Sequence, residues 1–206
     1  MSGYREPPCA GVLAEDDDEE KPKGKGSENL DLKLLEARTI LVEGPVTDRM
    51  YRAVCARLLY LEHKDPKGEI LVVVNSPGGS ADSGFGIYDM MRFVQCPIKT
   101  LCAGLCASAA VLIYLGSARG KRFSLPHSRF LLHQPSTTTF GQASDMEITA
   151  NEILRTRKKY AEVIAREIES NTEKVVADSN RDFWLSAEEC KKYGLVDKII
   201  IARKEM

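Results

Sequence analysis

Short apolar strands alternate with helices through the centre of this 206-residue chain, and that order constrains the fold more than any other feature. The segment Glu69–Asn75 is nearly all β-branched and apolar, as expected for a strand covered on both faces. It runs into the turn Ser76-Pro-Gly-Gly79, and Ser80 can then begin a helix that reaches about Val94. Strands and helices of this length predict right-handed crossovers and a mostly parallel sheet in an α/β protein.

The same pattern occurs on both sides of this central unit. Four further strands are predicted, at Thr39–Val42, Ile98–Ala103, Arg122–Leu125 and Arg129–His133. Thr47 is predicted to cap the helix that follows the first of these strands. After the second strand, Gly104 is predicted as a turn and Leu105–Gly116 as a helix.

One long helix dominates the C-terminal third of the sequence. Ser144-Asp-Met-Glu147 has the form of a capping box, and apolar residues then share one helix face as far as Ile168. A second capping box, Ser186-Ala-Glu-Glu189, begins a short helix that ends at Gly194, before a last strand at Lys198–Ala202. So long a helix with a single apolar stripe usually packs on another element or another subunit.

Charge, hydropathy and cysteine usage exclude several classes of protein. Lys and Arg number 29 against 30 Asp and Glu, and a net charge of −1 argues against nucleic acid as the main partner. The longest apolar run, Leu101–Leu115, is shorter than the roughly 20 residues that span a bilayer. The six cysteines form no CxxC pair, which predicts reduced thiols and no metal site. We therefore expect a soluble, cytoplasmic protein without a membrane partner.

Residues 1–33 are predicted to form a variable N-terminal leader, disordered or processed, ahead of a single domain over residues 34–206. The acidic run Asp16–Glu20 abuts a stretch rich in lysine and glycine, which cannot bury enough apolar area to offset its ordering entropy. The acidic run is also incompatible with a secretory signal. A specific docking arm is the alternative role for this segment.

Ser108 is the candidate nucleophile. It lies just inside the helix predicted after Ile98–Ala103, where the helix dipole and unpaired amides favour a developing oxyanion. The alternative is a small residue that eases helix packing. The surrounding segment, Gly104–Ala110, lacks the second glycine of a GxSxG nucleophile elbow.

A nucleophilic serine needs a base, and the base needs an orienting carboxylate. Among the three histidines, His133 is the best candidate because it ends an apolar strand, whereas His63 lies in a polar stretch and His127 in a turn. A purely structural role is the alternative for His133. Asp182 precedes two aromatic residues and must be paired to stay ionised at low cost, with a histidine or Arg181 as its partner.

Glycines in the turn Asn75-Ser-Pro-Gly-Gly79 expose backbone amides that can donate to an anion or a substrate carbonyl. A tight connection between a strand and a helix is the simpler interpretation. Two other segments fail as nucleotide loops, because Gly84–Asp89 lacks a third glycine and Gly116–Arg122 is one residue too short. We expect no nucleotide site in this chain.

Six motifs occur in an order that identifies a family. They are Asn75-Ser-Pro-Gly-Gly79, Gly104 with Ala107-Ser108, Gly120-Lys-Arg-Phe123, His133-Gln-Pro135, Gly141-Gln-Ala143 with Asp145, and Arg181-Asp182 with Tyr193-Gly-Leu-Val-Asp197. So arranged, over about Leu34 to Ile200, they closely resemble the proteolytic subunit of the ATP-dependent Clp protease. The resemblance implies the ClpP/crotonase-like fold, a spiral of ββα units with a protruding handle helix.

Carried over residue by residue, the resemblance implies a serine endopeptidase. Ser108 matches the family's nucleophile, His133 its general base and Asp182 its orienting acid. The backbone amides of Gly79 and Ala109 match its oxyanion hole. The implied reaction is peptide-bond hydrolysis through an acyl-enzyme, with neither a metal nor a cofactor.

The family assembles as two stacked heptameric rings that enclose the active sites, so the resemblance implies a homo-oligomeric tetradecamer or rings shared with a paralogue. The helix from Ser144 matches the handle that joins the rings, and Pro135–Gly141 matches the strand edge on which substrate pairs. Unfolded polypeptides are the implied substrates. ATP would be used by a separate AAA+ unfoldase of the ClpX, ClpA or ClpC type, not by this chain.

The sequence departs from the family's pattern at several positions. Residues 1–33 lack the usual segment that forms axial pore loops, and Thr137–Thr139 replaces a common glycine pair. Ala109 replaces a frequent methionine, and Asn180 stands where an acidic residue often supports ring contacts. Two alternatives follow: a ring partner with weak or no activity alone, and a crotonase-like acyl-CoA enzyme, which the filled triad positions disfavour.

Overall fold

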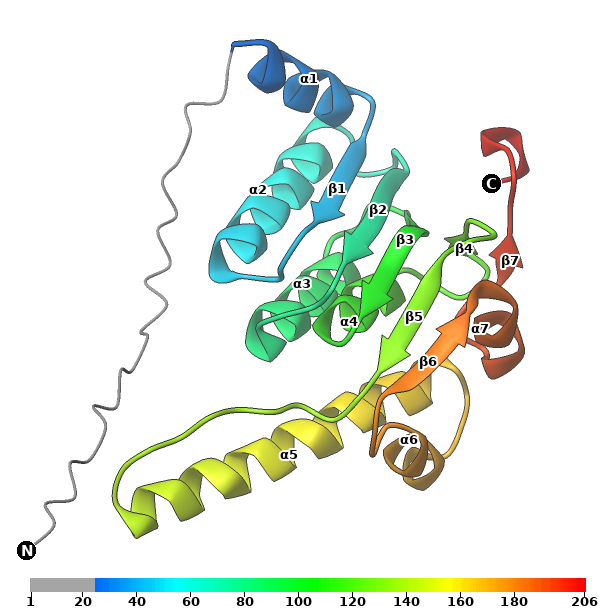
Figure 1. Ribbon diagram of the computed structural model, residues 1–206. Coiled ribbons are helices and arrows are strands. Elements are labelled where there is room, and N and C mark those ends of the chain that lie inside the picture. The colour runs from blue at the N-terminus through cyan, green and yellow to red at the C-terminus, as the bar shows by residue number, and fades with distance from the viewer. Residues whose placement is uncertain (1–24) are drawn as a thin grey trace, which may run out of the picture.

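The computed structural model describes residues 25–206, with side chains from Leu30 onward (Figure 1). Most of the predicted leader, residues 1–24, lies outside the described residues. Helix α1 (Lys25–Glu36) crosses the boundary that we predicted between residues 33 and 34. Within the part that is described, no helix combines the length and the apolar character that a membrane crossing needs.

A parallel sheet with the strand order β1-β2-β3-β4-β7 forms the centre of the molecule. Its strands are β1 (Thr39–Glu43), β2 (Ile70–Ser76), β3 (Ile98–Ala107), β4 (Arg122–Ser124) and β7 (Lys198–Ile199). Near its end β3 changes partner and pairs in parallel with β5 (Arg129–Leu132). On its other side β5 pairs antiparallel with β6 (Phe183–Ser186). The predicted α/β class with a mostly parallel sheet is confirmed.

Helices connect these strands and cover the sheet (Figure 1). They are α2 (Asp48–Lys64), α3 (Ala81–Phe93), α4 (Ala109–Leu115), α5 (Ala143–Glu167), α6 (Thr172–Asp178), α7 (Ala187–Tyr193) and a 3₁₀ turn at Arg203–Glu205. The predicted cap of α2 is confirmed, because Thr47 accepts the amide of Met50. Ser80, predicted to begin α3, is its N-cap and accepts the amide of Ser83. The capping box that begins α7 is also present.

The predicted turn at Gly104 is wrong, because β3 continues through it to Ala107. Gly104 has a φ of 119°, and the register between β2 and β3 shifts after Val74, so the glycine sits in a bulge. The side-chain oxygen of Asn75 accepts the amide of Leu105 at 3.1 Å, which allows the strand to resume. Helix α4 therefore begins at Ala109 and not at the predicted Leu105.

Three other expectations need correction. The capping box predicted at Ser144 is wrong, because α5 begins at Ala143 and its cap, Gln142, makes no side-chain capping bond. The last strand is shorter than predicted and ends at Ile199. Helix α6 and strand β6 were not predicted at all, since each is short and lacks a clear hydrophobic period.

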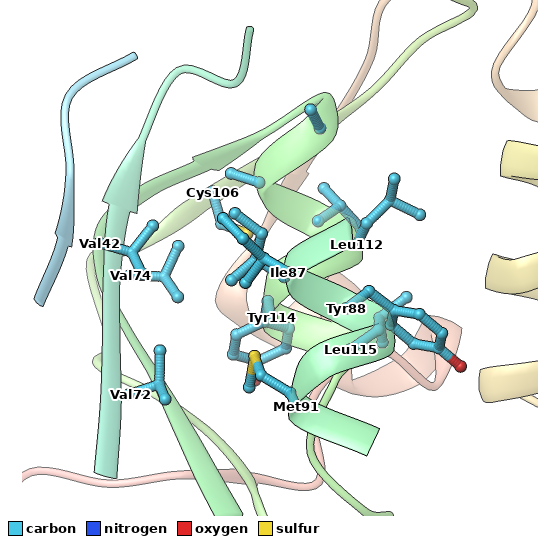
Figure 2. Close-up of a cluster of buried hydrophobic side chains, with 14 of the residues drawn as sticks. Val42, Val72, Val74, Ile87, Tyr88, Met91, Cys106, Leu112, Tyr114 and Leu115 are labelled. Carbon is cyan, nitrogen blue, oxygen red and sulfur yellow. The ribbon is translucent and has the colours of Figure 1, made fainter. Parts of the chain in front are cut away.

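A continuous apolar core lies between the sheet and helices α3 and α4. Figure 2 shows side chains from β1 and β2, such as Val42 and Val74, facing Ile87 and Met91 of α3. All seven residues of α4 are buried. Because α4 cannot shift without disrupting this packing, its N-terminal end is held in a fixed place.

A buried ion pair ties the ends of α4 and α5 to β4. Arg122 is fully buried, and its guanidinium donates to the carbonyl oxygens of Leu115, Ser117 and Glu167. It also contacts the Glu167 carboxylate at 2.5 Å, and the hydroxyl of Tyr88 donates to the other carboxylate oxygen at 2.5 Å. Both charges are thus paired and hydrogen-bonded, as burial requires.

We expect this carboxylate to make folding sensitive to acid. Burial disfavours its charged form, but hydrogen bonds from Tyr88 and Arg122 outweigh burial and hold the pKa of Glu167 below its ordinary value of 4.5. A carboxyl whose folded pKa is lowered stabilises the protein above its unfolded pKa, and the stabilisation is lost as pH falls through the folded pKa. The free energy of unfolding should therefore decrease below about pH 4.5.

Glu167→Gln should lower the free energy of unfolding by about 2–3 kcal/mol at neutral pH, because Arg122 loses its counter-charge. The amide oxygen of glutamine still offers one hydrogen-bond acceptor. The stability of this variant should also depend less on pH between pH 3 and about pH 5. Denaturant unfolding at several pH values measures both effects. Parallel pH profiles for the wild type and Glu167→Gln would contradict the assignment.

Candidate active site

Ser108 occupies the junction between β3 and α4, with φ of 55° and ψ of −124°. It is therefore the residue before the helix and not, as predicted, the residue just inside it. Such a positive φ is strained for a residue that carries a Cβ, so the surroundings must hold it. The amide of Ser108 donates to Leu131 of β5 at 2.9 Å, and its carbonyl accepts the amide of Val111 at 3.0 Å. The junction has the geometry of a nucleophile elbow although the GxSxG pattern is absent.

The glycine turn after β2 packs directly against this junction. A Cβ on Gly78, whose φ is 88°, would lie 2.6 Å from the Ala107 carbonyl oxygen and 2.7 Å from the Ser108 Cβ. A Cβ on Gly79 would collide with the carbonyl oxygen of Val46. Val46 also hydrogen-bonds the backbone on both sides of Gly79, at 2.8 Å each. Only glycine therefore fits at either position without moving the backbone.

Two backbone amides near Ser108 have no hydrogen-bond acceptor among the residues that the structure describes. The N–H of Ala109 begins α4 and so has no partner within the helix. Neither this N–H nor that of Gly79 donates a hydrogen bond to another residue in the 25–206 segment. Both residues line one cavity with Ser108, so the two amides are available to an oxygen bound there.

That cavity has a volume of about 450 Å³ and is bounded by the glycine turn, the start of α4, the end of β5 and the side of α5. Its lining residues are Pro77, Gly78, Gly79, Ser80, Ala81, Phe85, Ser108, Ala109, Leu112, His133, Pro135, Ser136, Thr156 and Tyr160. The structure thus brings Ser108 and His133 to one cavity from separate strands. His63 and His127, the two rejected histidines, do not line it.

Antiparallel pairing of β5 with β6 brings His133 and Asp182 together. Leu132 lies opposite Phe183 in this antiparallel pair. His133 follows Leu132 and Asp182 precedes Phe183, so these two residues are neighbours across the strand pair. The His133 Nδ1 atom lies 3.8 Å from the Asp182 carboxylate. This distance exceeds a hydrogen bond of about 2.7–3.2 Å. The Asp182 side chain is 66% exposed, so its carboxylate remains hydrated.

Hydrogen bonds around Asn180 hold the segment that carries Asp182. The side chain of Gln134, next to His133, donates to the Asn180 carbonyl at 3.0 Å. Arg157 of α5 donates to the Asn180 side-chain oxygen at 3.1 Å. Arg181, the alternative partner, makes no ion pair with Asp182 among the described residues. The hydrogen bond between Asn180 and Arg157 joins distant segments and was not predicted from the sequence, where Asn180 stood out only as a departure from the family's pattern.

Comparison with known proteins identifies the family. The family model described as Clp protease matches residues 22–203. The chain belongs to the Clp protease family. A solved structure of a ClpP1 mutant from Listeria monocytogenes matches with a TM-score of 0.79 and 36% identity, over 85% of this chain and 98% of that chain.

The Clp protease match confirms the predicted resemblance and the ClpP-type α/β fold. Helix α5, the predicted handle, projects away from the sheet in Figure 1. Its N-terminal half exposes large apolar side chains of the predicted stripe, with Met146 42% and Leu154 57% exposed. Its C-terminal half is buried against the domain from Tyr160 onward. The single apolar stripe predicted for this helix therefore divides into a packed part and an uncovered part.

Proposed function

We propose that this chain is a serine endopeptidase that hydrolyses peptide bonds of unfolded polypeptides. The observation that carries the proposal is the strained junction at Ser108, which lines one cavity with His133 and with two amides that lack an acceptor within residues 25–206. A hydroxyl, an imidazole and free donors around one space are the parts that acyl transfer needs.

In the proposed reaction His133 accepts the proton of the Ser108 hydroxyl as the serine oxygen attacks a peptide carbonyl. The Nδ1 atom of His133 faces Asp182, which leaves Nε2 for the serine. The amides of Gly79 and Ala109 stabilise the oxyanion, and His133 then returns the proton to the leaving amine. Water then attacks the acyl-enzyme while His133 accepts one of its protons, and His133 returns a proton to the Ser108 oxygen as the acid product leaves.

Residues 135–141, which have no regular secondary structure, are proposed to bind the substrate backbone. Pro135 and Ser136 line the cavity beside Ser108, so a peptide laid along this segment would reach the nucleophile. An extended peptide can pair with such an exposed chain edge through its backbone groups.

We also propose that the chain assembles into heptameric rings, stacked through α5 with a second copy or a paralogous ring. Exposed Met146 and Leu154 on the apolar stripe of α5 support this, because an uncovered apolar stripe is a typical interface. Ile148, also exposed, lies on another face of the helix. A separate AAA+ unfoldase would supply unfolded chains and consume the ATP. Neither a metal nor a cofactor takes part in the proposed chemistry, and the cytoplasm is the proposed compartment.

The 3.8 Å separation of His133 and Asp182 favours a second candidate, a ring subunit with weak activity until it assembles. Without a hydrogen bond from its Nδ1 atom, the imidazole is less well oriented towards the serine. Assembly or a partner ring would then be needed to bring the carboxylate closer. We do not propose acyl-CoA chemistry, because the family match favours the peptidase.

Labelling with a fluorophosphonate tests the proposed chemistry. We expect the full chain to gain one phosphonyl group per subunit and peptide mapping to find it on Ser108, because Ser108 occupies the strained junction directly before the Ala109 amide. Ser80 and Ser136, which also line the cavity, should stay unlabelled. Hydrolysis of an unstructured fluorogenic peptide should be lost in step with labelling. Labelling at another serine, or full hydrolysis by the labelled protein, would refute the assignment.

A further inference from the structure

We infer that Tyr160 is a positioning residue whose hydroxyl orients the peptide unit that supplies one of the two oxyanion donors. This inference rests on the proposed function, since it concerns the same cavity. Tyr160 lies in α5, far along the chain from Ser108, and nothing in the sequence pattern pointed to it. Its hydroxyl donates to the carbonyl oxygen of Ser108 at 3.1 Å.

The carbonyl of Ser108 and the N–H of Ala109 belong to one planar, trans peptide unit, so they point in opposite directions. Whatever fixes the direction of the carbonyl also fixes the direction of the N–H. Two donors hold this carbonyl, the Tyr160 hydroxyl from α5 and the Val111 amide from α4. They approach from different elements, so together they define the peptide plane more strictly than either alone.

This peptide unit needs such support because Ser108 has a strained backbone with φ of 55°. The amide of Ser108 is anchored by Leu131 on the side of β5. On the other side, the Tyr160 hydroxyl supplies an anchor that does not depend on α4 itself. Rotation of the peptide plane would aim the Ala109 N–H away from the oxyanion and weaken the site.

The state of the Tyr160 side chain suits this role. It is 6% exposed, and burial raises its pKa well above the ordinary value near 10, so the hydroxyl keeps its proton at all working pH values. A buried hydroxyl without an acceptor would be costly, and the Ser108 carbonyl is the acceptor it has. Hydrogen bonding at a carbonyl also polarises the attached amide, which makes the Ala109 N–H a stronger donor.

Tyr160→Phe tests this inference because it removes one oxygen and keeps the ring in place. We expect kcat for a fluorogenic peptide to fall about 5- to 20-fold, less than the loss of about 10²–10³-fold when a donor itself is removed. The KM should stay within about twofold, because the ground-state carbonyl needs the donor less than the oxyanion does. Tyr114→Phe is the matched control, since it removes a hydroxyl that donates to a backbone carbonyl, that of Phe123, from another buried tyrosine that does not line the cavity.

A pair of inhibitors separates positioning from a merely structural role. A peptide boronate forms a tetrahedral adduct with an oxygen in the hole, whereas the same peptide with its reacting carbonyl reduced to methylene has none. Tyr160→Phe should lower the affinity for the boronate by about the same factor by which it lowers kcat/KM, and it should leave the affinity for the reduced peptide unchanged. Equal weakening of both inhibitors, or a kcat within twofold of the wild type, would overturn the inference.

Activity of the wild type distinguishes failure of the Tyr160 inference from failure of the proposed function. If the wild type neither hydrolyses peptides nor reacts with a fluorophosphonate, the proposed function fails and this inference falls with it. If the wild type does both and Tyr160→Phe behaves like it, only the role of Tyr160 is refuted. Native mass measurement of each variant ensures that rates are compared at the same assembly state.

Discussion

Ser108→Ala should lower peptide hydrolysis by at least about 10⁴-fold, because the variant loses the proposed nucleophile and with it the acyl-enzyme route. The backbone should tolerate the change, since alanine carries the same Cβ as serine at this positive φ. The melting temperature and the assembly state should therefore match those of the wild type. The assay is turnover of an unstructured fluorogenic peptide by the full chain.

Two further variants sharpen this test. Ser170→Ala, between α5 and α6 and away from the cavity, should keep full activity. His133→Ala should lose about as much as Ser108→Ala, and the double variant should be no worse than either, because base and nucleophile act as a unit. Losses that multiply in the double variant would mean that the two residues act independently.

Gly78→Ala should reduce both stability and activity. Its Cβ would meet the Ala107 carbonyl oxygen and the Ser108 Cβ at 2.6 and 2.7 Å, so the junction must move. We expect the free energy of unfolding to fall by about 2–4 kcal/mol because of backbone strain and overpacking. A displaced nucleophile should lower kcat by about 10²-fold.

Gly120→Ala is the matched control for this prediction. Gly120 has a similar φ of 81°, but nothing lies within 4 Å of an added Cβ. The control should therefore show the backbone penalty alone, about 1–2 kcal/mol, with unchanged kcat. Chemical denaturation and peptide turnover of both variants give the comparison. If Gly78→Ala resembles Gly120→Ala in both measurements, the close packing of the glycine turn does not support the nucleophile.

Local patterns in the sequence were enough to predict much of the fold. The β-branched run Glu69–Asn75 contains most of β2, and the caps at Thr47, Ser80 and Ser186 are made by residues within one turn. Such features depend on neighbours along the chain, so a single sequence contains the information. The family motifs added the choice of Ser108, His133 and Asp182 as a set, and their catalytic roles are what we propose.

Features that depend on distant segments could not be predicted in this way. The bulge at Gly104 depends on Asn75 in the neighbouring strand, which hides the true start of α4. Strand β6 has only four residues, and it is a strand because it pairs with β5. The hydrogen bond from Tyr160 to Ser108 likewise joins residues that are far apart in the sequence. In each case the partner, not the segment itself, determines the structure.

The most direct test of the account is a crystal structure of the assembled protein with a peptide boronate bound. The account predicts a bond from boron to the Ser108 Oγ, with one boronate oxygen accepting the amides of both Gly79 and Ala109. It also predicts that His133 and Asp182 approach from 3.8 Å to hydrogen-bond distance. A boronate attached elsewhere, or one whose oxygens face away from both amides, would contradict it.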